Sequence, residues 1–186
     1  MTVSLTEVRF HGRGGQGAWT ASLLLAQAGL KENRFIQSFP AFGPERAGAP
    51  ITAFTRISDT PIHIHSSVYE PDVVVVLDPT LLGKSVVDGV KPDTILVVNT
   101  KMSPLELKES LGLLANEVWT LDATSLALKV LNRPITNTAM LGAVVKATGL
   151  VELTSLLEVT GLRFTGSIKE PNLEVIRLSY EEAVMG

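Results

Sequence analysis

The chain has 186 residues, a formal net charge of −3 and no cysteine. Its length suits one domain spanning residues 1–186, and the absence of thiols excludes disulfides, a cysteine nucleophile and cysteine-bound iron–sulfur clusters. The pI near 5.6, without a basic stripe interleaved with aromatic residues, indicates that nucleic acid is not a partner.

The hydropathy of the sequence indicates no membrane span and predicts contact with another protein. The longest purely aliphatic run, residues 73–77, is far shorter than the roughly 20 residues that cross a bilayer. The N-terminal segment lacks the basic and apolar regions of a signal peptide, so we expect a cytoplasmic protein without membrane contact. Charged residues make up only 19% of the chain and mean hydropathy is +0.28, which predicts an apolar surface packed on a partner.

Short apolar runs alternate with segments of helical period along the sequence. This pattern predicts an α/β fold, with a mostly parallel but mixed sheet and helices on both faces. Residues 58–61 have the composition of a turn, so strands 50–57 and 61–65 are expected to form an inserted β-hairpin. The predicted strands cover residues 7–11, 34–39, 50–57, 61–65, 72–77, 94–98 and 117–121.

Helix boundaries are marked by capping residues. Ser103 with Glu106 predicts a capped helix that runs to about residue 114, and Asp122 or Thr124 caps the next one. A further helix begins at residue 136 or 137 and ends at Gly149, and a last short helix opens at residue 171. The first helix is expected over residues 18–30, directly after a glycine-rich segment.

That glycine-rich segment is the first candidate site. A strand runs into a loop with four glycines and then into a helix, an arrangement that brings backbone N–H groups close to a phosphate. Gly12, Gly14 and Gly17 also fit the dinucleotide fingerprint, but the acidic residue that a NAD site wants at the end of the second strand is missing. A third interpretation is that the glycines only make a tight turn against a closely packed helix.

Other candidate groups have ordinary structural explanations. Residues 40–50 are expected to form a stiff loop in which Arg46 either binds an anion or carboxylate or makes a solvated ion pair with Glu45. His63 and His65 share a strand face without a third metal ligand. His11 could donate to a phosphate on the glycine segment, but it more simply completes the first strand. Three polar residues follow predicted strands, and helix caps, turns or strand ends explain them; they are Asp78, Asn99 and Asp122. No nucleophile has an adjacent base. We therefore expect neither a catalytic residue nor a metal site in this chain.

Three segments taken together resemble a known family. They are residues 10–17 (FHGRGGQG), residues 39–40 with 43–46 (FP and GPER), and residues 137–142 (NTAMLG). In this order they resemble the gamma subunit of pyruvate:ferredoxin oxidoreductase, with similarity from about residue 5 to the C-terminus. The resemblance implies a subunit of a heterotetramer that oxidatively decarboxylates pyruvate with coenzyme A to acetyl-CoA and CO2 and reduces ferredoxin.

The resemblance also implies roles for the three segments. Thiamine diphosphate, magnesium and 4Fe–4S clusters would belong to alpha, beta and ferredoxin-like delta subunits, and coenzyme A would be the ligand of this chain. Its diphosphate would lie on the glycine segment, formed by Gly12, Arg13, Gly14, Gly15, Gln16 and Gly17. Residues near the substrate or a partner subunit would be Pro44, Glu45, Arg46, Asn137, Thr138 and Met140.

Two features and two alternatives accompany this interpretation. Ala47 stands where many relatives carry a second arginine, and Trp19 is bulky for a phosphate-facing turn and is expected to pack on a neighbouring subunit. Within the wider family, the chain could instead serve a branched-chain 2-oxoacid (ketoisovalerate) oxidoreductase. From another class, it could be a free-standing regulator that binds a nucleotide or coenzyme A.

Overall fold

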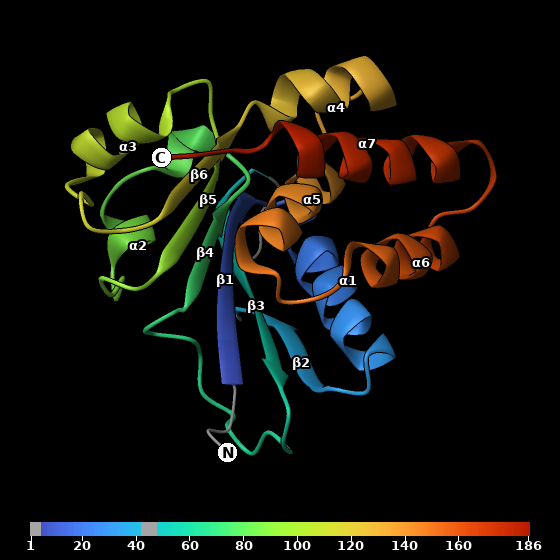
Figure 1. Ribbon diagram of the computed structural model, residues 1–186, viewed down its shortest axis with the longest axis horizontal. Coiled ribbons are helices and arrows are strands. Elements are labelled where there is room, and N and C mark those ends of the chain that lie inside the picture. The colour runs from blue at the N-terminus through green and yellow to red at the C-terminus, as the bar shows by residue number, and fades with distance from the viewer. Residues whose placement is uncertain (1–4, 42–47) are drawn as a thin grey trace.

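The computed structural model describes residues 5–41 and 48–186, in which one mixed sheet is covered by helices on both faces (Figure 1). Within these residues the strands lie side by side in the order β2-β3-β1-β4-β5-β6-β7. Their bounds are Leu5–Arg13 for β1, Phe35–Pro40 for β2, Pro50–Ser58 for β3, Val73–Val76 for β4, Ile95–Asn99 for β5, Val118–Leu121 for β6 and Val184–Met185 for β7.

The helices of the described residues form two groups about this sheet. In Figure 1, α2 and α3 lie on one side and α1, α4, α5, α6 and α7 on the other, which confirms the predicted helices on both faces. Short 3-10 turns, η1 (Pro79–Leu81) and η2 (Gly166–Ile168), precede α2 and α7. The helix bounds are Ala18–Lys31 for α1, Lys84–Val87 for α2, Pro104–Leu111 for α3, Ala123–Leu131 for α4, Asn137–Thr148 for α5, Leu153–Arg163 for α6 and Lys169–Glu182 for α7.

Strand directions confirm a mixed sheet. β1, β4, β5 and β6 run parallel to one another, whereas β3 is antiparallel to β1 and β7 is antiparallel to β6. The carboxyl ends of the parallel strands therefore share one edge, where ligands bind in open α/β sheets.

The inserted hairpin exists, but its strands are not the predicted pair. β3 pairs with β2, with Phe39 opposite Phe54, while residues 61–65 form no strand. Both edges of β3 are already occupied, by β1 and by β2, so no edge is left for residues 61–65. Side chains hold this segment instead, since Gln37 donates to the Ile62 carbonyl and Arg56 donates to the Ile64 carbonyl. The hairpin prediction for 61–65 was wrong because composition alone cannot show which edge is free.

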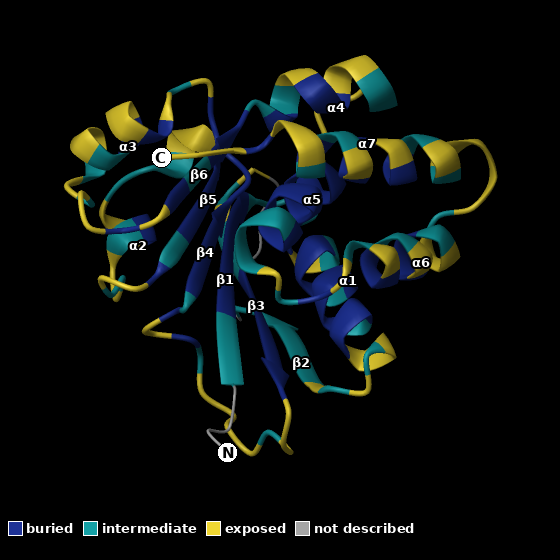
Figure 2. Ribbon diagram, viewed as in Figure 1, coloured by how far each residue is buried: buried dark blue, intermediate teal, exposed yellow. Residues whose placement is uncertain are grey.

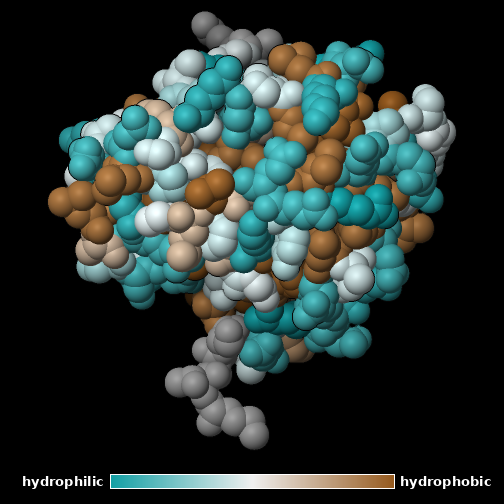
Figure 3. Space-filling view, turned by 45° about the horizontal axis from the view of Figure 1, so that its top comes forward, coloured by the Kyte–Doolittle hydropathy of each residue, from teal (hydrophilic) through white to brown (hydrophobic). Residues whose placement is uncertain are grey.

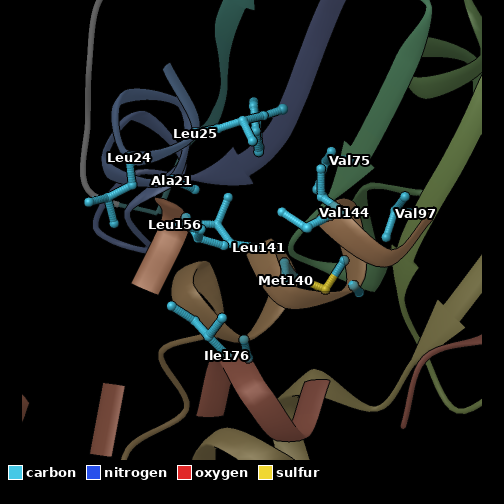
Figure 4. Close-up of a cluster of buried hydrophobic side chains, with 14 of the residues drawn as sticks. Ala21, Leu24, Leu25, Val75, Val97, Met140, Leu141, Val144, Leu156 and Ile176 are labelled. Atoms are coloured by element: carbon cyan, nitrogen blue, oxygen red, sulfur yellow. The ribbon is translucent and has the colours of Figure 1, made fainter. Parts of the chain in front are cut away.

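Helix α5 is the centre of the main hydrophobic core. Met140, Leu141 and Val144 are buried and pack with residues of the sheet, α1 and α7 (Figure 4). Gly142 allows α7 to lie close, because a Cβ at this position would approach the Ile176 carbonyl oxygen to 2.2 Å. Figure 2 shows most of α5 buried, beneath α7 and beside α1, with its last residues half-buried.

Several helix boundaries agree with the capping signals and others do not. Ser103 and Glu106 form a capping box, Asp122 caps α4, and Gly149 is left-handed with a φ of 57°. Helix α3 ends at Leu111 and not near 114, because Gly112 takes a left-handed conformation with a φ of 68°. The prediction missed α6 and β7, and α7 begins at Lys169, two residues before Pro171, and has 14 residues instead of forming a short helix.

Candidate functional site

The glycine-rich segment lies between β1 and α1 at the carboxyl end of the parallel strands. Gly12 and Arg13 still belong to β1, so the loop itself is residues 14–17. Gly15 and Gly17 have φ angles of 94° and 80°, in the left-handed region that favours glycine. A Cβ on Gly17 would also lie 2.4 Å from Asn137 Nδ2, and one on Gly12 would lie 3.2 Å from Ala18 Cβ. The glycines therefore allow both the turn and the close approach of α1 and α5.

Polar side chains fix one side of this loop. The guanidinium of Arg13 pairs with Asp78 at 3.2 Å, donates to Thr80 Oγ1 at 2.8 Å and donates to the Gly48 carbonyl at 3.1 Å. Gln16 donates to Asp78 Oδ2 at 2.7 Å and accepts from the Arg13 backbone N–H at 2.7 Å. We call Arg13, Gln16, Asp78 and Thr80 the loop clamp.

The charge of the clamp is stable at neutral pH. Burial by itself would raise the pKa of Asp78, but hydrogen bonds from Thr80 and Gln16 and the charge of Arg13 outweigh it, so this pKa is lowered. An ionised Asp78 compensates the charge of Arg13. The Arg13 side chain is thus held by contacts within the chain.

The other side of the loop keeps unused donors. Within the described residues, the backbone N–H groups of Gly15 and Gly17 make no hydrogen bond, whereas that of Gly14 donates to the Ala49 carbonyl at 2.9 Å. Gly17 provides no side-chain cap for α1, and the first turn of α1 has no acidic residue. Among the described residues, neither a cap nor an acid in the first turn therefore neutralises the positive end of the α1 dipole.

Both glycines line a cavity of about 660 Å³ between α1, the α4–α5 connection and the α6–α7 connection. Its lining contains Gly15, Gly17 and the nine-tenths buried Asn137, together with apolar side chains such as Phe164 and Ile168. Arg133 and Arg163 also line it, and no Asp or Glu of residues 5–41 or 48–186 does. The cavity suits a ligand that has anionic groups and an apolar part.

Comparison with known proteins decides the family. The family model described as pyruvate ferredoxin/flavodoxin oxidoreductase matches residues 7–182. The chain belongs to this family. It is 51% identical over 179 residues to the pyruvate/ketoisovalerate oxidoreductases common subunit gamma of Pyrococcus furiosus, covering 96% of this chain and 97% of the relative. It is 46% identical over 179 residues to pyruvate synthase subunit PorC of Methanothermobacter thermautotrophicus, covering 96% of each.

A solved structure gives the same answer. The crystal structure of pyruvate oxidoreductase subunit PORC from Thermotoga maritima has a TM-score of 0.88 to this chain at 39% identity, covering 98% of both chains. The chain is a gamma subunit of a pyruvate:ferredoxin oxidoreductase, and it therefore works together with other subunits. This confirms the family and the oxidoreductase activity that the three segments predict.

Three residues of segment 137–142 were predicted to lie near the substrate or a partner subunit, and the structure places them in different surroundings. Asn137 reaches the cavity, whereas Thr138 and Met140 are completely buried inside the chain. Thr138 donates to Asn172 Oδ1 at 2.9 Å, and Met140 packs in the main core. Pro44, Glu45 and Arg46, with Ala47, lie outside the described residues.

The remaining polar candidates of the gamma subunit have structural roles. Asn99 donates to the Leu77 carbonyl and to Thr124 Oγ1, and Asp122 accepts from the Ser125 N–H, so each of them anchors α4. In residues 5–41 and 48–186, His, Asp and Glu side chains form no group of three that could hold a metal ion. Helices long and apolar enough to span a membrane are likewise absent from the described part of the chain.

His11 has an unusual environment on β1. Its side chain is buried, and within the described residues its Nε2 atom has no hydrogen-bond partner. Burial, together with the charge of Arg9, lowers the pKa of His11 to about 4. His63 and His65 are exposed, on a segment that is not a strand. Trp19 is 52% exposed at the start of α1, a position open to contact with another subunit.

The topology also bears on the dinucleotide alternative. In a Rossmann unit, the second strand lies beside the first and presents the acidic residue to the ribose. Here β2 is at the sheet edge, separated from β1 by β3, so its end does not lie next to the glycine loop.

Sequence reasoning missed the far wall of the cavity. Arg133 follows α4, and Arg163 is the last residue of α6. Neither belongs to a recognisable motif, and each is more than 110 residues from the glycine loop. No local signal could have joined them, because the α4–α5 and α6–α7 connections meet only through the packing of their helices.

Proposed function

We propose that this gamma subunit holds the diphosphate of coenzyme A at the N-terminus of α1 within a multi-subunit pyruvate:ferredoxin oxidoreductase. The alpha, beta and ferredoxin-like delta subunits carry thiamine diphosphate, magnesium and the 4Fe–4S clusters. Ferredoxin accepts the electrons released when pyruvate becomes acetyl-CoA and CO2. The gamma chain has no cysteine with which to ligate a cluster, in keeping with this division of labour. We place the complex in the cytoplasm.

One observation carries the proposal for coenzyme A. Gly15 and Gly17, whose N–H groups have no partner among the described residues, line a cavity beside the uncapped end of α1, and the described part of its lining includes no carboxylate. A hydrogen bond to an ionised group contributes roughly 1.5 to 3 kcal/mol, and a helix N-terminus up to about 2 kcal/mol more. Such contacts are large enough to hold a diphosphate.

The chemical contribution of this chain is then orientation. The diphosphate end of coenzyme A is fixed at the glycine loop, and the thiol end extends to the partner subunit where the acyl group is formed. Because binding energy far from the reacting sulfur positions it, loss of the cradle raises the KM for coenzyme A. The isolated gamma chain is expected to turn over no 2-oxoacid.

A glycine substitution in the assembled complex tests this role. Gly15→Asp adds a carboxylate where the diphosphate lies, and nothing within 4 Å obstructs a Cβ there. We expect the KM for coenzyme A to rise by about tenfold or more, because the added carboxylate repels the diphosphate, while the KM for pyruvate stays the same. Gly112→Asp is the matched control, because Gly112 is also left-handed and open but lies at the end of α3. An unchanged KM for coenzyme A in an intact Gly15→Asp complex would refute the cradle.

A second 2-oxoacid is favoured by the names of the relatives. The Pyrococcus furiosus protein is called a subunit common to pyruvate and ketoisovalerate oxidoreductases. We therefore propose that the gamma chain also serves a branched-chain enzyme, since the cavity holds coenzyme A and not the acyl group. Affinity isolation from native cells, followed by assays with pyruvate and with 3-methyl-2-oxobutanoate, tests this. Recovery of the chain alone would support the free-standing regulator instead.

A further inference from the structure

The cavity has a second cationic wall that the glycine loop does not explain. Arg133 lies in the α4–α5 connection and Arg163 closes α6, and both line the same cavity as Gly15 and Gly17. Within the described residues, neither guanidinium makes an ion pair or a hydrogen bond; the arginines that do are Arg9, Arg13, Arg34 and Arg56. Two arginines of one cavity are thus available to a ligand.

The surroundings of these arginines favour an anion. Among the described residues, no Asp or Glu lines the cavity, so this part of the lining carries two positive charges without a negative one. Asn137 is 94% buried and lies against Gly17, and within the described residues its Nδ2 amide donates no hydrogen bond, while its Oδ1 accepts from the Thr138 N–H. Because Asn137 lines the cavity, a ligand there can accept a hydrogen bond from this amide.

The walls between the two polar regions are apolar. Ile135, Phe164, Ile168 and Pro171 line the cavity, and Ile168 is 55% exposed although it is a large hydrophobic residue. Brown hydrophobic side chains are also visible among teal polar ones where the carboxyl-end edge of the molecule is turned forward (Figure 3). The cavity therefore offers an apolar surface with one anion-binding group at the glycine loop and another at the arginines.

We infer that Arg133 and Arg163 bind a phosphomonoester that is separate from the diphosphate on the glycine loop. This rests on the proposed function and gives the cavity a ligand class, a 3′-phosphorylated ADP derivative whose adenine contacts the apolar wall. A guanidinium suits a phosphate dianion because its planar set of donors can make two parallel hydrogen bonds. The arginines are then the residues that distinguish coenzyme A from 3′-dephospho-coenzyme A.

The assembled oxidoreductase tests this with two thiol substrates. The KM for coenzyme A and the KM for 3′-dephospho-coenzyme A are measured for the natural complex and for Arg133→Gln and Arg163→Gln. We expect the natural complex to prefer coenzyme A, and each variant to raise its KM for coenzyme A about tenfold, as expected for one lost charge-assisted hydrogen bond, with little change for the dephospho compound. Lys129→Gln is the control, since Lys129 is an exposed cation of α4 that does not line the cavity.

Each outcome supports or overturns the inference. If the natural complex does not distinguish the two thiols, or if the variants raise both KM values equally, the phosphomonoester site is wrong. If a glutamine variant fails to assemble, Arg133→Lys and Arg163→Lys replace it, because lysine keeps the positive charge. If a lysine variant assembles but its complex does not prefer coenzyme A to the dephospho compound, the arginines are subunit contacts and the inference is overturned. Gly15→Asp is expected to raise the KM for coenzyme A and the KM for 3′-dephospho-coenzyme A. If it raises neither, the diphosphate cradle is wrong, and the arginine variants still test the phosphomonoester site separately.

Discussion

The two faces of strand β1 are built in opposite ways. On one face, Val8 and Phe10 are completely buried in the main core, and Gly12 meets α1. On the other face, Arg9, His11 and Arg13 alternate with them and are buried or pinned by specific partners. Both faces end at the same glycine loop, so one strand both supplies the core and fixes the loop.

The difference shows how tolerant each face is. Apolar burial depends on area and fit and is stabilised by any side chain of suitable shape. The polar face depends on individual partners: Arg9 donates to the Val86 carbonyl at 3.0 Å and to the Asp88 carbonyl at 2.6 Å. On the neighbouring β3, the fully buried Arg56 pairs with Glu7 at 2.6 Å and lies 5.3 Å from the Phe39 ring centre. Removing one partner on this face leaves the other buried and uncompensated.

The largest expected effect comes from breaking the apolar face. Phe10→Ala removes a completely buried ring and leaves a cavity between the sheet and its helices. We expect the free energy of unfolding to fall by about 3 to 5 kcal/mol, measured by urea denaturation. Phe35→Ala is the control, because Phe35 is 45% exposed at the start of β2, and its loss should cost less than about 1 kcal/mol. Equal losses would mean that Phe10 contributes no more to the core than a partly exposed ring.

The polar face gives a pH effect of intermediate size. His11 is buried and neutral with a pKa of about 4, whereas an unfolded histidine has a pKa near 6.5. Between these values the unfolded chain binds the proton more tightly, so stability falls as the pH drops through this window. From pH 7 to pH 5 we expect a loss of about 2 kcal/mol from this residue.

A leucine substitution isolates that contribution. His11→Leu removes the titrating group, and because Nε2 has no partner among the described residues, the change should cost little at pH 7. The wild-type loss between pH 7 and pH 5 should therefore exceed the variant's by about 2 kcal/mol in urea denaturation. His63→Leu serves as the control, since His63 is exposed. If the His11 variant keeps the full pH dependence, the titrating group lies elsewhere.

Sequence predicted those parts of the molecule that depend on local pattern. The alternation of apolar runs located β1, β4, β5 and β6, and capping residues located the starts of α3 and α4 because Ser103 and Asp122 act on their own helix ends. The glycine loop was found for the same reason. Pairing was not predictable in this way: residues 61–65 look like a strand, but β3 had no free edge. The cavity wall at Arg133 and Arg163 depends on tertiary packing and left no local signal.

The smallest expected effect links the polar face to the site. Asp78→Asn keeps the shape of the loop clamp but removes the charge that Arg13 and Gln16 face. Since the Arg13 side chain is 33% exposed, solvent screens part of this interaction, and we expect a loss of about 1 to 2 kcal/mol at pH 7. The folded-state pKa of Asp78 is lowered, so its contribution is present at neutral pH and disappears as the pH falls through that lowered pKa. In acid the variant and the natural chain should therefore converge in urea denaturation. Asp93→Asn, at an exposed carboxylate, should show no such convergence.

The Asp78→Asn variant also tests whether the loop clamp acts on the site. If Asp78 positions the donors of Gly15 and Gly17, Asp78→Asn raises the KM for coenzyme A several-fold in the complex. An unchanged KM would mean that the clamp contributes to stability alone.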